Sequence, residues 1–470
     1  MLSSSYAIAA VAIVGAAAYL ALRLRCYVTT TAMLVGSLLL IYGPLFLTYT
    51  LCQGEAQCLI HLLQYGISYK PVPHPTFATI KGTIADLDSV IIAMNLSIAL
   101  MYAGIIAGIE VVDRIAPQRI AAMQGALSSW NSRPLADNDA RYVLLAAILA
   151  LLAFMLAISV TENHVGNILK FLSLVGEDNA ARNALRLNHG GSPNYFYRLV
   201  LGAIAPMFVI WGLLSSWQRK SWVLFVASAL LFAATFIGKS ATLSKAPPAF
   251  FLIQLGLAAL LISSNRITWR IALGATFIVA LVLYAVTRLV MIFPAGTDIL
   301  QVVFTRAFEA TNQALLENFA VFPSLHPFRD GVGIRPVAML IGVPFIPNYS
   351  IVAHAWYGNY DVTSNALFIA DAWADFSYAG VALYSVAAGI TCRGIDAIFL
   401  TRRKSVVAIA VLAATFIGVC TLLATALNTA LLSGGLLLAP IVATLLLVVA
   451  RQFSRSDTAR PSSAEVPQER

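Results

Sequence analysis

Long apolar stretches alternate with short polar connectors along most of this chain. A helix that spans a bilayer needs about 20 mostly apolar residues, and eleven stretches meet that length. They lie near residues 5–22, 30–51, 87–112, 141–161, 196–216, 221–238, 247–264, 271–293, 366–391, 405–427 and 429–450. Because backbone inside lipid must satisfy its own hydrogen bonds, the pattern predicts an all-α polytopic membrane protein. Residues 1–452 are expected to form one transmembrane domain, and residues 453–470 a disordered cytoplasmic tail.

Composition agrees with this interpretation. The 470 residues are 60% hydrophobic and only 11% charged, whereas a soluble protein has about 25% charged residues. No CxxC pair and no GxGxxG or Walker sequence occurs, so we expect neither a metal nor another cofactor. Cys52 and Cys58 share one connector, where they either form a disulfide or remain two free thiols.

Basic residues gather in the short connectors on one side of the predicted bundle. Since such connectors stay in the cytoplasm, the N-terminus is expected outside and the C-terminus inside. This topology accounts for the net charge of +9 without nucleic acid as a partner. Three external segments are long, about 52–86, 162–195 and 294–365, and all six histidines lie in them. The distribution favours a site on the external face.

A polar stretch from Phe322 to Asp375 covers the end of the third external segment and the start of the next predicted helix. Its five prolines prevent one continuous helix, which predicts an aromatic-lined loop. The helix that follows carries Asp371 and Asp375 at i and i+4. If that helix begins near Ala366, both carboxylates lie in the membrane and line a polar cavity. If it begins near Phe376, they stay at the interface.

Several basic residues on the external side are suited to an anionic ligand. Arg182 and Arg186 would share one face of a helix and could hold a phosphate or diphosphate, unless that helix is merely solvated. Lys239 and Lys245 lie in a very short external connector, and Arg288 lies inside an apolar stretch. Snorkelling to lipid head groups is the alternative explanation for these three.

Residues 299–320 have the pattern of an amphipathic helix. Apolar side chains fall on one face, and Arg306 and Glu317 fall on the other. Such a helix typically lies on the membrane surface. We expect it to cover the external site as a lid.

Three short motifs resemble one family of membrane enzymes. They are GKSATLSKAPP at 238–248, FPSLHPFRDGVG at 322–333 and NALFIADAWADFSYAGV at 365–381. Together with the helix number and the basic external loops, they resemble the Wzy-type oligosaccharide repeat-unit (O-antigen) polymerases, which are related to O-antigen ligases. The chain has Asp375-Phe376-Ser377-Tyr378 where an Asn-Phe-Gly order is commoner in that family.

The resemblance implies a glycosyltransferase with a GT-C-like bundle in the bacterial inner membrane. The donor would be a glycan on undecaprenyl diphosphate, and the acceptor a second lipid-linked repeat unit. A flippase and a chain-length regulator would be partners in polysaccharide biosynthesis. An O-antigen ligase differs only in its acceptor and remains an alternative. A transporter or flippase of lipid-linked sugars is the rival from another class, but it would place ionisable residues deep in several helices.

The chemistry of such a transfer suggests roles for the polar residues. Fixed cations would stabilise the diphosphate as it leaves, and a base would take the proton of the acceptor hydroxyl. We prefer His354 as this base, with His326, Asp361 and Asp371 as alternatives. The expected cations are Arg182, Arg186, Lys239, Lys245, Arg288, Arg306, Arg329 and Arg335, and the expected sugar-stacking residues are Trp356, Tyr357 and Tyr360.

Overall fold

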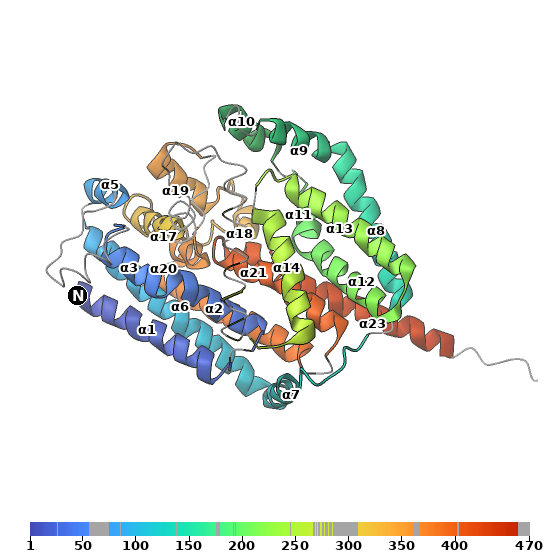
Figure 1. The fold of residues 1–470 in the computed structure, drawn as a ribbon. Helices are drawn as coiled ribbons and strands as arrows, with labels where there is room; N and C mark the ends of the chain where they lie inside the picture. The colour runs from blue at the N-terminus through green and yellow to red at the C-terminus, as the bar shows by residue number, and fades with distance from the viewer. Residues whose placement is uncertain are drawn as a thin grey trace, which may run out of the picture.

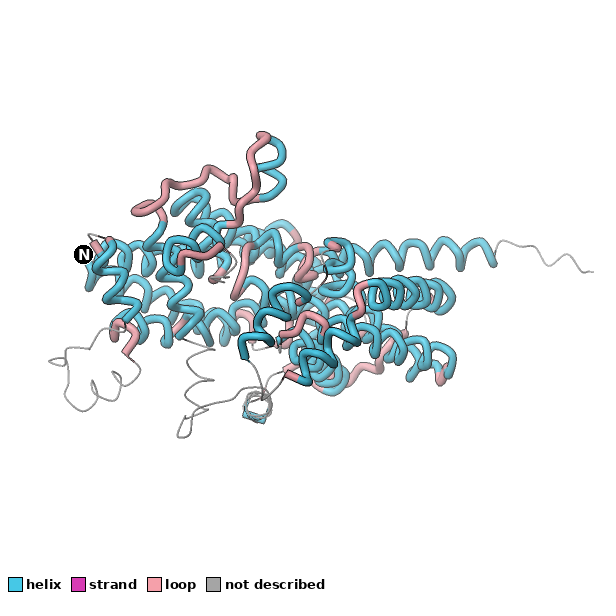
Figure 2. Tube along the Cα trace, turned by 90° about the horizontal axis from the view of Figure 1, so that it is seen from above, coloured by secondary structure: helices cyan, strands magenta, loops and turns pink. Residues whose placement is uncertain are grey.

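The computed structural model confirms a nearly all-helical chain. It describes residues 1–25, 27–55, 75–84, 86–137, 140–174, 179–190, 192, 194–244, 246–266, 309–360, 366–401 and 404–458, with isolated positions between 268 and 284. Among these residues there is no strand, only two isolated bridges. Figure 2 shows from above how helices dominate the described chain.

The longer helices are α1 (Leu2–Leu22), α2 (Thr30–Tyr42), α6 (Leu87–Ile115), α7 (Pro117–Ser128), α8 (Arg141–Thr161), α12 (Ala205–Arg219), α13 (Trp222–Ser240), α14 (Ala246–Ser263), α17 (Ala310–Val321), α20 (Phe368–Phe399), α21 (Val406–Leu422) and α23 (Leu438–Thr458). The shorter ones are α3 (Pro44–Leu51), α5 (Pro75–Thr83), α9 (His164–Ser173), α10 (Asn179–His189), α11 (Tyr195–Leu199), the π-helix η2 (Val200–Ile204), α18 (Arg335–Leu340), α19 (Asn348–Tyr357) and α22 (Leu427–Leu431).

Hydropathy predicted the membrane helices well. Eight helical segments of the described chain are long and apolar enough to cross a bilayer, and α21 and α23 are shorter apolar helices. Each predicted stretch coincides with one of them except 271–293, which lies mostly outside the described residues. The protein is therefore a multi-pass membrane protein, while eleven spans and the orientation remain predictions.

The last predicted span differs in detail. Instead of one helix over 429–450, α22 ends at Leu431 and α23 begins at Leu438. Gly435 lies between them with φ +82°, a backbone conformation that favours glycine and interrupts the helix. At its other end α23 continues to Thr458, beyond the predicted boundary at 453, and residues 459–470 lie outside the described chain.

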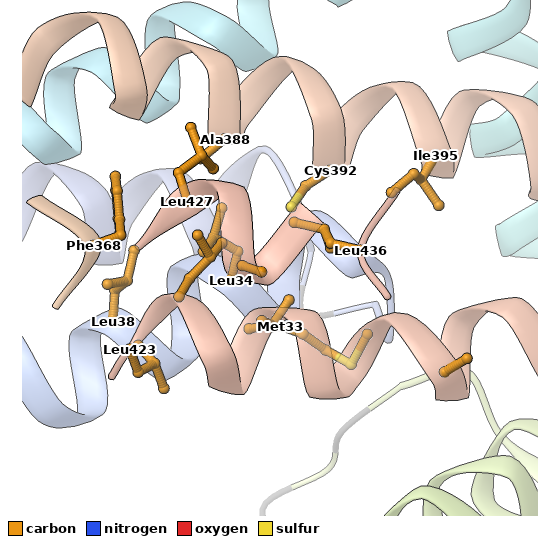
Figure 3. Close-up of a cluster of buried hydrophobic side chains, with 14 of the residues drawn as sticks. Met33, Leu34, Leu38, Phe368, Ala388, Cys392, Ile395, Leu423, Leu427 and Leu436 are labelled. Carbon is orange, nitrogen blue, oxygen red and sulfur yellow. The ribbon is translucent and has the colours of Figure 1, made fainter. Parts of the chain in front are cut away.

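Two groups of helices pack around α21 (Figure 1). One group contains α1, α2, α6 and α20, and the other contains α8, α12, α13 and α14. Residues 406–415 of α21 are buried on every side, as expected of a helix that is apolar all round. Figure 3 shows part of the core beside it, formed by Met33, Leu34, Leu38, Phe368, Ala388, Cys392, Ile395, Leu423, Leu427 and Leu436.

Small residues allow α6 and α20 to cross closely. A Cβ added to Gly104 would lie 2.8 Å from Ser385 Cβ, and one added to Gly108 would lie 2.9 Å from Ile390 N. Gly389 of α20 lies against the Ile105 backbone in the same way. Glycines at such crossings let membrane helices gain van der Waals contact and are difficult to replace.

Buried ion pairs secure one end of this group. Arg393 donates to Asp113 through Nε at 2.6 Å and Nη2 at 2.9 Å, and Arg23 adds a third contact at 3.2 Å. Nearby, the buried Asp396 accepts the Thr30 N–H at 2.8 Å, which satisfies a free donor at the start of α2. These contacts join α1, α2, α6 and α20 at the end predicted to be cytoplasmic.

The opposite end holds the described parts of the three long external segments. In Figure 1, α5, α9, α10 and α19 lie at this end, far from α7. Cys52, in the first segment, is disulfide-bonded, and Cys58 lies outside the described residues. The sequence had left a disulfide and free thiols equally open.

The prediction of a surface helix over 299–320 is wrong for the described part. Helix α17 begins at Ala310 and packs against α5, α6, α19 and α20. Its polar residues Glu317 and Asn318 are buried, at 3% and 2% exposed. Their polar atoms find partners inside the protein: Gln313 donates to Glu317 at 2.9 Å, and Asn318 donates to the Ala314 carbonyl at 2.8 Å. Residues 301–308, including Arg306, lie outside the described chain.

Candidate functional site

A break in α20 organises the candidate site. The helix begins at Phe368, but Phe376 (φ −138°, ψ 16°) and Ser377 (φ 56°, ψ −146°) leave the helical conformation. A short first part therefore carries Asp371 and Asp375, and the longer part follows the break. The sequence offered two starting points for this helix, near Ala366 and near Phe376. The first lies close to the start of the short part, and the second lies at the break before the longer part.

A loop pairs with the backbone exposed by this break. Carbonyls at the end of a helix lack partners within it. Here the N–H of Arg329 donates to the Ala374 carbonyl, and the N–H of Asp330 donates to the Asp375 carbonyl, both at 3.0 Å. Gly331, with φ +88°, makes the turn beside Phe376. The FPSLHPFRDGVG segment therefore holds the broken helix in place.

Arg329, Asn348 and Asp375 form a polar chain under this loop. Arg329 Nη1 donates to Asn348 Oδ1 and to the Ile346 carbonyl, each at 2.6 Å. Asp375 is 1% exposed and accepts the Gly333 N–H at 3.0 Å, with Asn348 Nδ2 at 3.5 Å. Burial lowers the pKa of the Arg329 guanidinium, and the carboxylates of Asp375 and Asp371 oppose that shift. Arg329 thus holds the loop as well as supplying positive charge.

Trp373 anchors the first part of α20. Its indole N–H donates to the Phe322 carbonyl at 2.8 Å. Its ring stacks on Phe319 with centroids 4.7 Å apart and meets Phe328 and Tyr378 edge-on at 5.4 Å and 4.9 Å. Aromatic pairs of this kind are worth about 0.5–1.5 kcal/mol beyond burial. The carboxylates on either side of Trp373 are therefore carried by a rigid element.

Helix α19 presents aromatic residues beside this element. His354 stacks on Tyr360 with ring centroids 4.0 Å apart, and Tyr357 and Tyr360 are about half exposed. We call His354, Tyr357 and Tyr360 the aromatic platform. The Tyr357 hydroxyl donates to Glu317 Oε1 at 2.6 Å, and Trp356 Nε1 donates to the Glu317 carbonyl at 3.2 Å.

Glu317 is the residue that sequence reasoning missed. It had been placed on the solvated face of a surface helix, yet it supports the platform from within the protein. The sequence carried one usable signal. Gln313 and Glu317 lie at i and i+4 in an otherwise apolar turn of α17. This is the spacing at which two side chains on one helix face can hydrogen-bond.

The two candidate histidines have different surroundings. Nδ1 of His326 lies 2.9 Å from the Pro327 carbonyl, and its ring meets Phe322 edge-on at 5.4 Å. His354 is exposed apart from its stacking on Tyr360. Within the described residues neither histidine hydrogen-bonds a carboxylate, so the choice of base remains a prediction.

The predicted cations fall into three sets. Arg329 and Arg335 belong to the loop region, where Arg335 is exposed with its guanidinium 5.9 Å from the Phe345 ring centre. The second set lies in the group of α8 to α14 and consists of Arg182, Arg186 and Lys239. Arg182 is 9% exposed and faces Phe171, and Lys239 is 4% exposed and faces Phe251. Arg186 is exposed. Lys245, Arg288, Arg306 and Asp361 lie outside the described residues.

The fold and site together define a class of protein: a multi-pass helical membrane protein with a polar, aromatic site at one end of its bundle. In the part of the chain that the structure describes, no group of three or more His, Cys, Asp or Glu side chains is arranged to hold a metal ion. In comparisons with family models, curated proteins and solved structures, nothing matches this chain.

Proposed function

We propose that the protein is a membrane glycosyltransferase that polymerises lipid-linked oligosaccharide repeat units. The observation that best supports this proposal is the aromatic platform at the C-terminal end of α19, beside the broken helix α20. Exposed rings can stack on sugar faces, and Tyr357 is held rigid by a buried carboxylate. A sugar-binding surface at one end of a membrane bundle suits a substrate with a glycan head and a lipid tail.

The proposed reaction takes place at the outer face of the bacterial inner membrane. The acceptor hydroxyl attacks the anomeric carbon of the donor glycan, and the bond from that carbon to undecaprenyl diphosphate breaks. His354 takes the hydroxyl proton, a step typically worth 10²- to 10⁴-fold in rate. Fixed cations such as Arg329 and Arg335 stabilise the charge that develops on the diphosphate.

A reconstituted assay tests this proposal directly. The purified protein in lipid vesicles receives undecaprenyl-diphosphate-linked repeat units, and the products are resolved by gel electrophoresis. A ladder of products, with release of undecaprenyl diphosphate, supports the polymerase. Transfer only when lipid A core is added would identify a ligase instead. Movement of unchanged substrate across the vesicle membrane would identify a flippase.

Partners follow from the same proposal. A polymerase at the outer face needs a flippase to deliver its substrate, and a chain-length regulator would set when the polymer is released. The vesicle assay contains neither protein. Any polymer formed in that assay is therefore made by this protein without a flippase or a chain-length regulator.

A further inference from the structure

A second polar cluster lies where α8 ends and α9 begins. His164 Nε2 lies 3.0 Å from Glu162 Oε2, and the Ser192 hydroxyl donates to Glu162 Oε1 at 2.7 Å. Asn163, between the first two, has a left-handed backbone with φ 49° that turns the chain from α8 into α9. Both carboxylate oxygens are therefore occupied, and the imidazole ring is held in one orientation.

Two buried polar atoms in this cluster have no hydrogen-bond partner. They are His164 Nδ1 and the Tyr197 hydroxyl oxygen, on residues that are 3% and 1% exposed. The two rings have centroids 5.5 Å apart. Leaving a buried polar group unpaired costs about 1–3 kcal/mol, and buried polar groups in native proteins are nearly always paired with protein, water or ligand. The pair therefore marks a place for a small polar group.

The chemistry of the two atoms specifies that group. When Nε2 of a neutral imidazole donates to a carboxylate, Nδ1 presents a lone pair and accepts. The Tyr197 hydroxyl is free to donate. Its oxygen lies so close to Gly238 that a side chain there would overlap it, which keeps the phenol in position. A hydroxyl group can donate to His164 and accept from Tyr197 at once, and so can a water molecule.

We propose that His164 and Tyr197, oriented by Glu162, form a binding site for one hydroxyl of a sugar. The inference rests on the proposed function, since it makes this site part of how the enzyme recognises its glycan. It is separate from the aromatic platform, because it lies in the other group of helices: α9 packs against α8 and α13, and Tyr197 meets Phe154 of α8 and Gly238 of α13. A buried site built to pair a hydroxyl rejects an analogue that lacks it, because the buried groups are then left unpaired.

Binding of simple sugars to the full-length protein in nanodiscs tests the site without any need for turnover. The probes are the methyl glycosides of glucose, galactose and mannose, each with its monodeoxy analogues. We expect at least one glycoside to bind and to shift the ¹⁵N resonance of His164 Nδ1, assigned by its loss in His164→Gln. Removal of one particular hydroxyl from that glycoside should weaken binding at least tenfold.

Tyr197→Phe provides the matched variant. It removes only an unpaired hydroxyl, so thermal stability should be unchanged or higher. The parent glycoside should bind to Tyr197→Phe about tenfold more weakly than to wild type. On this variant it should bind no better than its deoxy analogue. Tyr195→Phe, at a half-exposed position two residues away, should bind as wild type. If glycosides bind without shifting His164, or bind Tyr197→Phe normally, the atoms enclose only a trapped water and the inference is wrong. Absence of all glycoside binding would overturn it equally.

The same experiment separates this inference from the proposed function. Glycoside binding at His164 by a protein that makes no polymer would keep the site and reject the polymerase. Polymer formation by wild type, together with normal glycoside binding by Tyr197→Phe, would keep the polymerase and reject the site. The comparison of parent and deoxy glycosides uses wild-type protein alone, so it stands even if a variant fails to fold.

Discussion

The backbone N–H of Gly333 donates a 3.0 Å hydrogen bond to the buried carboxylate of Asp375. A Cβ at Gly333 would lie only 2.6 Å from the accepting oxygen, so the loop can approach the carboxylate this closely only with glycine. This contact joins the FPSLHPFRDGVG loop to the broken helix. It adds a side-chain contact to the two backbone hydrogen bonds that Arg329 and Asp330 donate to the same helix.

Asp375→Ala should therefore loosen the loop. The substitution leaves the Gly333 N–H without its acceptor, at a cost of about 1–3 kcal/mol. Thermal unfolding in detergent should show a lower midpoint, and hydrogen exchange at 329–333 should accelerate. Ser324→Ala, at an exposed position of the same segment, is the control and should behave as wild type. Equal behaviour of the two variants would show that the contact does not hold the loop.

The predictions succeeded where bilayer physics dictates the pattern. A span must be about 20 apolar residues long, which located most helices from hydropathy alone. The prolines of the loop correctly predicted that it is not one continuous helix, and Asp371 and Asp375 lie on one helical segment, as their spacing predicted. The break at Ser377 was not foreseen, because neither residue of Phe376-Ser377 is a glycine or proline that would signal it.

Contacts between distant segments could not be predicted. Glu317 was misplaced because helical periodicity shows a polar face without showing whether solvent or protein covers it. His164 and Glu162 are two residues apart, a spacing that does not place side chains together on a helix. The left-handed turn at Asn163 brings them together, and Tyr197 arrives from another helix.

Ser377→Gly should stabilise the protein. Ser377 has φ 56° and ψ −146°, a region in which residues other than glycine are strained by about 1–3 kcal/mol. Glycine removes that strain, so the midpoint of thermal unfolding should rise. The control is Ser385→Gly in a regular turn of the same helix, where glycine should lower stability. A similar loss for both variants would contradict the strained conformation.

Gly108→Ala should disturb the crossing of α6 and α20. The added methyl group would meet the α20 backbone, with Ile390 N at 2.9 Å, so the helices must separate and lose packing. We expect low yields of monodisperse protein in size-exclusion chromatography. Gly394→Ala, on α20 with nothing within 4 Å of the added carbon, should be normal. Normal yields for Gly108→Ala would mean that the helices cross at a greater distance.

Tyr357 should give stability a pH dependence in the alkaline range. Burial raises the pKa of its phenol, and the hydrogen bond to Glu317 raises it further. The folded state then keeps a proton that the unfolded state releases above about pH 10. The contribution of Tyr357 to the free energy of unfolding is therefore fully present below pH 10 and decreases as the pH rises above 10. The stability difference between wild type and Tyr357→Phe, measured by chemical unfolding, should shrink between pH 9 and 11. A constant difference would rule out this contact.

Polymer synthesis by the reconstituted protein tests the central claim most directly. Lipid-linked repeat units are given to wild type, His354→Gln and His189→Gln, the last being an exposed histidine on α10. We expect ladders from wild type and His189→Gln, and at least a hundredfold slower elongation by His354→Gln, since glutamine cannot accept the proton. Repeat units left unconverted by the folded wild-type protein would contradict the account.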